Sequence, residues 1–254
     1  MSTIMQGPIV VTGAAGFIGR NVVAELNRRG RQDLILVDRL GSDERWANLV
    51  GLRFDDLVDA QAFLGQVTAG SAPPAGTVIH LGACSATTER DAGFLLENNY
   101  RYTRQLCEWC LGRGARFVYA SSAATYGDGA QGYCDEDARM PVLRPLNMYG
   151  YSKHLFDLWA LAHGALDQIV GLKYFNVYGP YEDHKGDMRS VVNKSYARIA
   201  AGQDVELFRS YHPDYADGEQ EAGVAHSCPD WLAPGVHRTS RAPKSLAARA
   251  ATKR

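Results

Sequence analysis

The chain has 254 residues, of which 46% are hydrophobic, and its 27 basic and 28 acidic residues give a formal net charge of -1. This balance excludes a surface built to bind polyanions, and no basic run is interleaved with aromatic residues as in nucleic-acid-binding segments. The apolar runs are short and interrupted, so no membrane-spanning helix is expected, and the N-terminal sequence MSTIMQGPIVV lacks signal-peptide features. We therefore expect a cytoplasmic globular protein that binds neither nucleic acid nor membrane.

Short apolar runs rich in β-branched residues alternate with amphipathic helical stretches along the chain. The expected strands are residues 8–13, 33–38, 77–83, 116–122 and 168–179. The expected helices, each with a glycine at its C-terminal end, are residues 17–30, 94–114 and 151–164. Nearly continuous apolar strands separated by helices indicate a parallel sheet buried on both faces. The sequence therefore predicts an α/β fold with a Rossmann-type, doubly wound parallel sheet.

The first expected strand runs directly into a glycine-rich turn. The turn, TGAAGFIG, spaces Gly13, Gly16 and Gly19 as G-x-x-G-x-x-G ahead of a helix. The first glycine permits a tight turn, the second lets the backbone approach a pyrophosphate, and the third allows close packing of helix and strand. A glycine-rich turn without a ligand is the competing interpretation, but the strand before it and the helix after it favour a dinucleotide site.

The end of the second expected strand bears on the choice of cofactor. Asp38 lies where an acidic residue would bind the adenosine ribose of NAD. Arg39 and Arg45 follow, and a guanidinium at that strand end would instead accommodate the 2′-phosphate of NADP. We predict NADP as the cofactor, with NAD as the alternative.

A catalytic site is expected between the fourth strand and the helix after it. Ser122 ends that strand, and ligands bind at the carboxyl ends of strands in open α/β sheets. The segment NMYGYSKHLFD contains Tyr149 and Lys153, whose spacing of four places both side chains on one helical face. A nearby ammonium and a positively charged cofactor would lower the pKa of the phenol, about 10 when unperturbed, so that Tyr149 acts as a base.

The glycine turn, the serine and the Tyr-Lys pair together resemble the extended short-chain dehydrogenase/reductase superfamily from about residue 7 to residue 220. Within it, several segments are similar to the ADP-L-glycero-D-manno-heptose 6-epimerase family: HLGACSATTERD, NNYRYT, YASSAATYG, PLNMYGYSKHLFD and LKYFNVYGPYEDHKGDMRSV. The last segment carries Lys185, which most other members of the superfamily lack. The resemblance implies an isomerase that inverts carbon 6 of ADP-heptose in lipopolysaccharide precursor synthesis and forms a homo-oligomer.

The resemblance also implies roles for individual residues. Tyr149 and Lys185 would be acid/base groups on opposite sides of the reacting carbon, Lys153 would support Tyr149, and Ser122 would orient the sugar. The implied cofactor-binding residues are Gly13, Gly16, Phe17, Ile18, Gly19, Asp38, Arg39, Arg45, Leu81, Gly82, Ala83, Cys84, Ser85, Asn98, Lys153, Val177 and Lys185. The implied substrate-binding residues are Ser122, Asn176, Asp187, Lys194, Phe208, Arg209 and Ser210. No metal ligand is expected.

Two departures from the family pattern weaken the choice between NAD and NADP. Leu81 stands where the family often has an acidic residue, and Arg45 and Ala60 stand where it often has lysines. For Lys185, a loop lysine that points into water is the competing interpretation. Another nucleotide-sugar epimerase or dehydratase, or a non-catalytic dinucleotide-binding protein, remains an alternative for the whole chain.

Several other reactive side chains are expected to have structural roles. Cys107 and Cys110 form a C-x-x-C, but they lie at helical spacing with no second Cys or His pair at ligand distance, so packing is favoured over a redox or metal role. Phe156 and Trp159 are expected on a helix packing face. The histidines read as structural or surface residues are His80, His154, His163 and His184.

The sequence changes character at about residue 220. Residues 221–254 contain six basic and two acidic residues, against 21 and 26 in residues 1–220. We therefore divide the chain into a dinucleotide-binding domain at 7–180, a partial substrate-binding region at 181–220 and an atypical basic tail at 221–254, expected to be disordered. A reading-frame change is favoured over a natural tail as its origin, with the substrate domain left incomplete.

Overall fold

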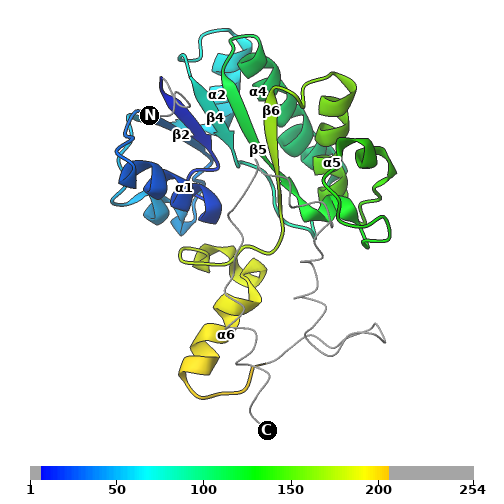
Figure 1. The fold of residues 1–254 in the computed structure, drawn as a ribbon. Helices are drawn as coiled ribbons and strands as arrows, with labels where there is room; N and C mark the ends of the chain where they lie inside the picture. The colour runs from blue at the N-terminus through cyan, green and yellow to red at the C-terminus, as the bar shows by residue number, and fades with distance from the viewer. Residues whose placement is uncertain (1–6, 206–254) are drawn as a thin grey trace.

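The computed structural model describes residues 7–205, apart from the side chains of Asp187 and Ala197, and shows one six-stranded sheet with helices packed against it (Figure 1). All paired strands are parallel, and their order is β3-β2-β1-β4-β5-β6. The strands are β1 (Ile9–Thr12), β2 (Leu34–Asp38), β3 (Asp56–Asp59), β4 (Thr77–His80), β5 (Arg116–Ser122) and β6 (Ile169–Tyr174). This strand order confirms the predicted Rossmann-type sheet. Expectations for residues 206–254, including Phe208, Arg209 and Ser210, lie outside the described residues.

The helical elements connect successive strands or follow the last one. The α-helices are α1 (Phe17–Arg28), α2 (Ala60–Thr68), α3 (Ala92–Leu95), α4 (Tyr102–Leu111), α5 (Met148–Ala162) and α6 (Val191–Ala200). Short 3-10 helices are η1 (Glu44–Leu49), η3 (Ala123–Tyr126), η4 (Asp137–Val142) and η5 (Asp183–Met188). A π-helical segment, η2 (Leu96–Arg101), joins α3 to α4.

The structure differs from the sequence prediction in several places. The last expected strand, 168–179, is too long, because β6 ends at Tyr174, where its pairing with β5 ends. Helix α6 was not expected. Strand β3 was not expected, because its sequence DLVD has aspartates at both ends, which are unfavourable in strands. It is an edge strand and pairs only with β2. Helix α2 after it was also missed; it is capped by Asp59, which accepts hydrogen bonds from the Gln61 and Ala62 N–H groups. Helix α5 begins at Met148, three residues before the predicted start, because Asn147 caps it through the Gly150 N–H at 2.8 Å.

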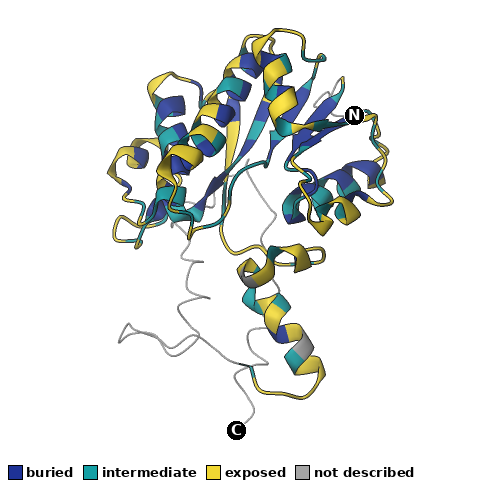
Figure 2. Ribbon diagram, turned by 180° about the vertical axis from the view of Figure 1, so that it is seen from behind, coloured by how far each residue is buried: buried dark blue, intermediate teal, exposed yellow. Residues whose placement is uncertain are grey.

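The central strands are buried on both faces, as the apolar runs predicted. Val10 of β1 belongs to the larger core cluster with residues of α2, α4 and α5, whereas Ile9 and Val11 pack on the opposite face with Val23 and Leu26 of α1. The burial pattern in Figure 2 shows the same division between buried strands and helices with one exposed side. Alternate residues of one strand therefore hold the two helical layers to the sheet.

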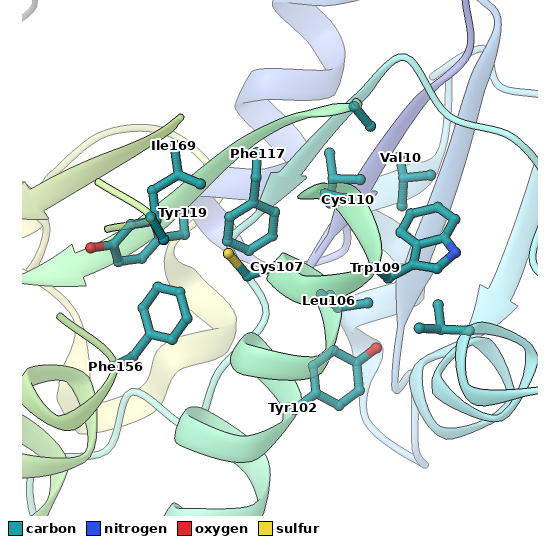
Figure 3. Packing of buried hydrophobic residues seen from close by; sticks show 14 of the residues in the cluster. Val10, Tyr102, Leu106, Cys107, Trp109, Cys110, Phe117, Tyr119, Phe156 and Ile169 are labelled. Atoms are coloured by element: carbon teal, nitrogen blue, oxygen red, sulfur yellow. The ribbon is translucent and has the colours of Figure 1, made fainter. Parts of the chain in front are cut away.

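The larger cluster contains the side chains for which a packing role was predicted (Figure 3). Cys107 and Cys110 are fully buried in it, and burial raises the pKa of the Cys107 thiol to about 12. Phe156 packs edge-on against Tyr119 with ring centroids 4.7 Å apart, and Trp159 stacks on Phe156. These packing predictions are confirmed.

Large apolar side chains are exposed around the end of the described chain. Val170 and Leu172 of β6 are exposed, and the smaller cluster on the face of α1 contains no residue of β6. Val192, Tyr196 and Ile199 form an exposed stripe on α6, which projects from the carboxyl edge of the sheet (Figure 1). Among the described residues, β6 and α6 therefore carry exposed apolar surface.

The glycine turn has no room for a side chain at Gly19, which generates a stability prediction. A Cβ atom there would lie 2.0 Å from the Gly13 carbonyl oxygen. We expect Gly19→Ala to lower the free energy of unfolding by about 1–3 kcal/mol or more, because backbone atoms must move apart. The measurement is urea-induced unfolding followed by circular dichroism.

The matched control is Gly65→Ala in α2, where an added Cβ would meet nothing within 4 Å. There we expect a gain of up to about 1 kcal/mol from helix propensity. Equal effects of the two substitutions would contradict the close packing of the glycine turn.

Candidate active site at the carboxyl edge of the sheet

The loops that follow β1 and β4 meet at the carboxyl edge of the sheet. Thr12 and His80 end these strands as register partners, and Gly13 and Gly82 follow them. Gly13 has a φ of +68°, and a Cβ on it would lie 2.7 Å from the Gly82 backbone nitrogen. Only glycine fits this contact, so the first glycine serves the approach of two loops as well as the turn.

The N-terminus of α1 has the features of an anion-binding site. Gly16 is its N-cap residue, and no side chain caps the helix. The first N–H groups of a helix have no intrahelical partner and carry the positive end of the helix dipole. With glycine on both sides of the turn, the backbone can approach a pyrophosphate closely, so the residues fit a dinucleotide.

Asp38, for which a ribose contact was predicted, ends β2 and contacts the glycine turn. Its Oδ2 accepts the Ala15 N–H at 2.7 Å and its Oδ1 accepts the Arg39 N–H at 2.7 Å. Burial raises the pKa of this carboxyl, while the hydrogen bonds from these N–H groups oppose the shift. The Arg45 guanidinium lies 3.9 Å from Asp38 and is held by Asp43 at 2.8 Å. Acidic and basic groups therefore share this strand end.

A buried histidine joins the two loops and was not predicted to belong to the site. The Nδ1 atom of His80 lies 2.6 Å from the Thr12 hydroxyl, which accepts the Gly82 N–H at 3.0 Å, and its Nε2 lies 2.8 Å from the Thr103 hydroxyl. Because the Thr103 hydroxyl donates to the Asn99 carbonyl, His80 Nε2 carries the proton and Nδ1 accepts. Burial lowers the pKa of His80 to about 3, and the nearby Lys153 charge adds to this effect.

Asn99 is a second buried residue that the sequence did not single out. The resemblance assigned the cofactor contact to Asn98, which donates to the Asn99 side-chain oxygen at 3.1 Å. Asn99 has no exposed surface and hydrogen-bonds both backbone groups of Cys84 in the predicted cofactor loop. The adjacent pair of asparagines was the only local signal, and it does not distinguish which one is buried.

The predicted serine, tyrosine and lysine come together between β5 and α5. Tyr149 hydrogen-bonds Ser122, and Lys153 is buried with its Nζ donating to the Ala120 carbonyl at 2.9 Å. Burial raises the pKa of Tyr149, the Ser122 hydrogen bond opposes this, and the charge of Cys84 adds to it. Burial also lowers the pKa of Lys153 to about 8. Among the groups of the protein itself, desolvation outweighs the Ser122 hydrogen bond, so the phenol pKa is raised. The expected lowering depends on a bound, positively charged cofactor and stays a prediction.

A buried acid-base pair supports the strand end that carries Ser122. Asp157 of α5 is fully buried and accepts hydrogen bonds from the Tyr119 and Ser121 hydroxyls at 2.8 Å each. Lys173 of β6 lies 3.9 Å from Asp157 and donates to the Thr125 hydroxyl at 3.1 Å. Burial raises the pKa of Asp157 and lowers that of Lys173. The pair ties α5, β5, β6 and η3 together immediately behind the predicted catalytic residues.

The segment after β6 lies against the glycine turn and carries Lys185. The Lys185 ammonium lies 5.4 Å from the ring centroid of Phe17. Asn21 of α1 donates to the Pro180 carbonyl at 3.1 Å, and the Arg20 guanidinium stacks on the Tyr181 ring at 3.6 Å. These contacts bring the segment 177–185 next to the start of α1, so Lys185 lies near the glycine turn.

The remaining residues predicted to bind cofactor or substrate lie at separate positions after β6. Val177 lines an apolar groove of about 500 Å³ together with Phe17 and Ile18. Asn176 is exposed, and Lys194 lies on α6. The side chain of Asp187 and the residues Phe208, Arg209 and Ser210 lie outside what the structure describes.

Comparison with known proteins places the chain in a family. The profile of the NAD dependent epimerase/dehydratase family matches residues 9–221. The chain belongs to this family. Within residues 7–205, no helix has the length and apolar character needed to cross a membrane.

Individual relatives agree with the family match. The ADP-L-glycero-D-manno-heptose-6-epimerase of Nitratidesulfovibrio vulgaris (strain DP4) is 59% identical over 212 residues, which cover 83% of this chain and 66% of that protein. The crystal structure of the Helicobacter pylori protein of the same name has 28% identity and a TM-score of 0.68, covering 82% of this chain and 67% of that one. MoeE5, solved with UDP-glucose and NAD, has 31% identity and a TM-score of 0.59, covering 80% and 64%. The chain spans 65–66% of the length of the curated relatives it matches.

The buried His80 generates a prediction about pH. The unfolded chain binds a proton at His80 near pH 6.5, whereas the folded protein resists protonation until about pH 3. The free energy of unfolding should therefore fall as the pH drops below 6.5, by up to about 1.4 kcal/mol per pH unit from this residue. We expect His80→Gln to reduce that slope, measured by urea unfolding between pH 7 and 5.

Two other histidines define the control. His154, whose pKa burial lowers to about 4, contributes a slope of the same sign in the wild type and in the variant. His163, the C-cap residue of α5, is likewise the same in the two proteins. An equal slope in His80→Gln and the wild type would show that His80 is not kept neutral by folding.

Proposed function

We propose that this chain epimerises carbon 6 of ADP-D-glycero-D-manno-heptose to give ADP-L-glycero-D-manno-heptose. The observation that carries the proposal is the meeting of Ser122, Tyr149 and Lys153 between β5 and α5, in a chain 59% identical to a protein bearing that enzyme's name. The relative's activity is transferred only as a proposal, because this chain spans 66% of its length. Assembly into a homo-oligomer is part of the same transfer.

We propose NADP as the resident cofactor, held by the glycine turn, Asp38 and the loop at 81–85. When bound, a nicotinamide dinucleotide supplies a ring that takes a hydride from the sugar carbon and returns it to the other face. The Arg45 guanidinium, 3.9 Å from Asp38, supports NADP over NAD because a 2′-phosphate needs a cation beside the ribose. Arg39, on the same strand end, donates to Gln61 at 2.9 Å.

Tyr149 and Ser122 would handle the proton of the substrate hydroxyl. Their hydrogen bond places two hydroxyl groups together at the carboxyl end of β5, where a third hydroxyl can join them. Lys153, fixed by the Ala120 carbonyl, would supply positive charge next to the phenol. Since burial raises the pKa of Tyr149, that added charge is needed for the phenol to act as a base near neutral pH.

Lys185 would be the second acid/base group. Inversion requires reduction from the opposite face of a ketone, so the product hydroxyl forms in a different orientation from the substrate hydroxyl. Lys185 belongs to a different element from Tyr149, and its contact with Phe17 brings it to the cofactor turn. A lysine on a short 3-10 helix can reach the sugar from a direction that α5 does not provide.

The function is tested by incubating the purified chain with ADP-D-glycero-D-manno-heptose and separating the two epimers by chromatography. We expect conversion in the wild type, and a loss of about 100-fold or more in Tyr149→Phe and in Lys185→Met, because each removes a proton-transfer group. Tyr151→Phe, an exposed tyrosine on the same helix, is the matched control and should retain the wild-type rate.

The outcomes separate the competing functions. A full rate in Lys185→Met would rule out the second acid/base role while leaving the epimerase assignment intact. Dinucleotide binding without conversion of ADP-heptose would overturn the epimerase proposal and favour a binding protein. Conversion of another nucleotide sugar instead would change the substrate.

The cofactor preference is tested by calorimetric titration with NADP and with NAD. We expect Arg45→Ala to weaken NADP binding by about tenfold relative to NAD, because the guanidinium would contact the 2′-phosphate, which NAD lacks. Arg116→Ala, an exposed arginine at the opposite edge of the sheet, should change neither affinity. An unchanged NADP:NAD ratio in Arg45→Ala would contradict this role.

A further inference from the structure

Asn99 lies where three parts of the candidate site meet. It sits in the π-helical segment η2, in the middle of what would otherwise be one continuous helix. Such segments are rare, and they occur often at functional sites. Its side chain has no exposed surface and lies between the loop at 81–85 and helix α5.

The hydrogen bonds of Asn99 use its whole capacity. Its Oδ1 accepts from the Cys84 N–H at 2.9 Å and from the Asn98 amide at 3.1 Å. Its Nδ2 donates to the Cys84 carbonyl at 3.0 Å and to the Ser152 hydroxyl at 3.0 Å. Two donor hydrogens and two acceptor lone pairs are thus all engaged. The N–H and C=O of one residue in the loop are both held by one planar group.

The Ser152 hydroxyl carries the connection to the catalytic turn. It donates to the Tyr149 carbonyl at 2.7 Å, and it is fully buried. Cys84 and Tyr149 are therefore joined through the side chains of Asn99 and Ser152, each of which hydrogen-bonds the next group in the chain. In a water-free environment such bonds are costly to break, so they fix relative positions closely.

The backbone of Asn99 joins a second chain of hydrogen bonds. Its carbonyl accepts from the Thr103 hydroxyl, which contacts His80, and His80 contacts Thr12 beside the glycine turn. One residue thus connects to the loops after β1 and β4 and to the start of α5. Its side chain hydrogen-bonds both the loop at 81–85 and helix α5.

We propose that Asn99 is a positioning residue that holds the cofactor loop at Cys84 in register with the catalytic turn at Tyr149. The proposal rests on the proposed function for its catalytic consequence, but its geometric part concerns only the loop and can be tested separately. Asparagine suits the position because its amide matches a peptide group as donor and acceptor. Aspartate would keep the acceptor for the Cys84 N–H but lose both donations, and alanine would lose all of them.

The test compares Asn99→Ala with Asn27→Ala in the full chain. Asn27 is the matched control, because it is also a buried asparagine whose side chain bonds both backbone groups of one residue, Arg53, but it lies at the far end of α1. Three quantities are measured: the rate at which iodoacetamide alkylates Cys84, followed by peptide mass spectrometry; the calorimetric affinities for NAD and NADP; and the epimerisation rate.

We expect Asn99→Ala to raise the alkylation rate of Cys84 and to weaken binding of the preferred dinucleotide, each by about tenfold or more, as the loop is released. Asn27→Ala should leave both within about twofold. If the Cys84 alkylation rate and the dinucleotide affinity of Asn99→Ala equal those of the wild type, the proposal is wrong. If that variant does not fold, Asn99→Asp decides in the same way, because it removes only the two donations.

The epimerisation readout separates this proposal from the proposed function. If the wild type does not convert ADP-heptose, the function fails while alkylation and binding still decide the role of Asn99. If the wild type is active, Ser152→Ala should lower kcat more than it changes KM, because the link to Tyr149 is cut and the link to Cys84 is kept. A Ser152→Ala variant with wild-type kcat would overturn the connection to the catalytic turn.

Discussion

The contact between Gly13 and Gly82 is the constraint on which the candidate site depends. A Cβ atom on Gly13 would lie 2.7 Å from the Gly82 backbone nitrogen. The loops after β1 and β4 can therefore lie this close only if residue 13 is glycine. Strands β1 and β4 are neighbours although β2 and β3 lie between them in the sequence, because the strand order runs from β1 to β3 in one direction and from β4 to β6 in the other. In such sheets, ligands bind in the crevice at the point where the order reverses. The glycine turn, the cofactor loop and the N-terminus of α1 are placed by this approach.

Buried polar groups then fix the remaining elements to that contact. His80 joins the two loops, Asn99 joins the cofactor loop to α5, and Asp157 joins α5 to the end of β5. Each is buried, and each has its hydrogen-bonding groups engaged, so displacing any of them would leave an unsatisfied polar atom. Apolar packing alone would hold the layers together without setting the register between loops this closely.

The parts of the site that could be predicted from the sequence are those that depend on local spacing. The glycine turn, Asp38 at a strand end and the Tyr149–Lys153 spacing are each contained in a few residues, and the parallel sheet follows from the apolar runs. The roles of Asn99 and Asp157 could not be predicted, because the partners that define them, Cys84 and Ser152 for Asn99 and Tyr119 for Asp157, are 15 to 53 residues away along the chain. Strand β3 was missed because its acidic ends oppose the local strand signal.

Burial has the same physical effect on both central catalytic candidates, because it disfavours charge on each. It raises the pKa of Tyr149, which favours the neutral phenol. It lowers the pKa of Lys153 to about 8, so the ammonium starts to lose its proton just above neutral pH. A site prepared in this way responds strongly to any charge brought close to it, since little water screens the interaction. A positive charge bound beside Tyr149 would therefore favour the phenolate, and the proposed role of Asn99 is to hold the loop at 81–85 where a bound group can supply that charge.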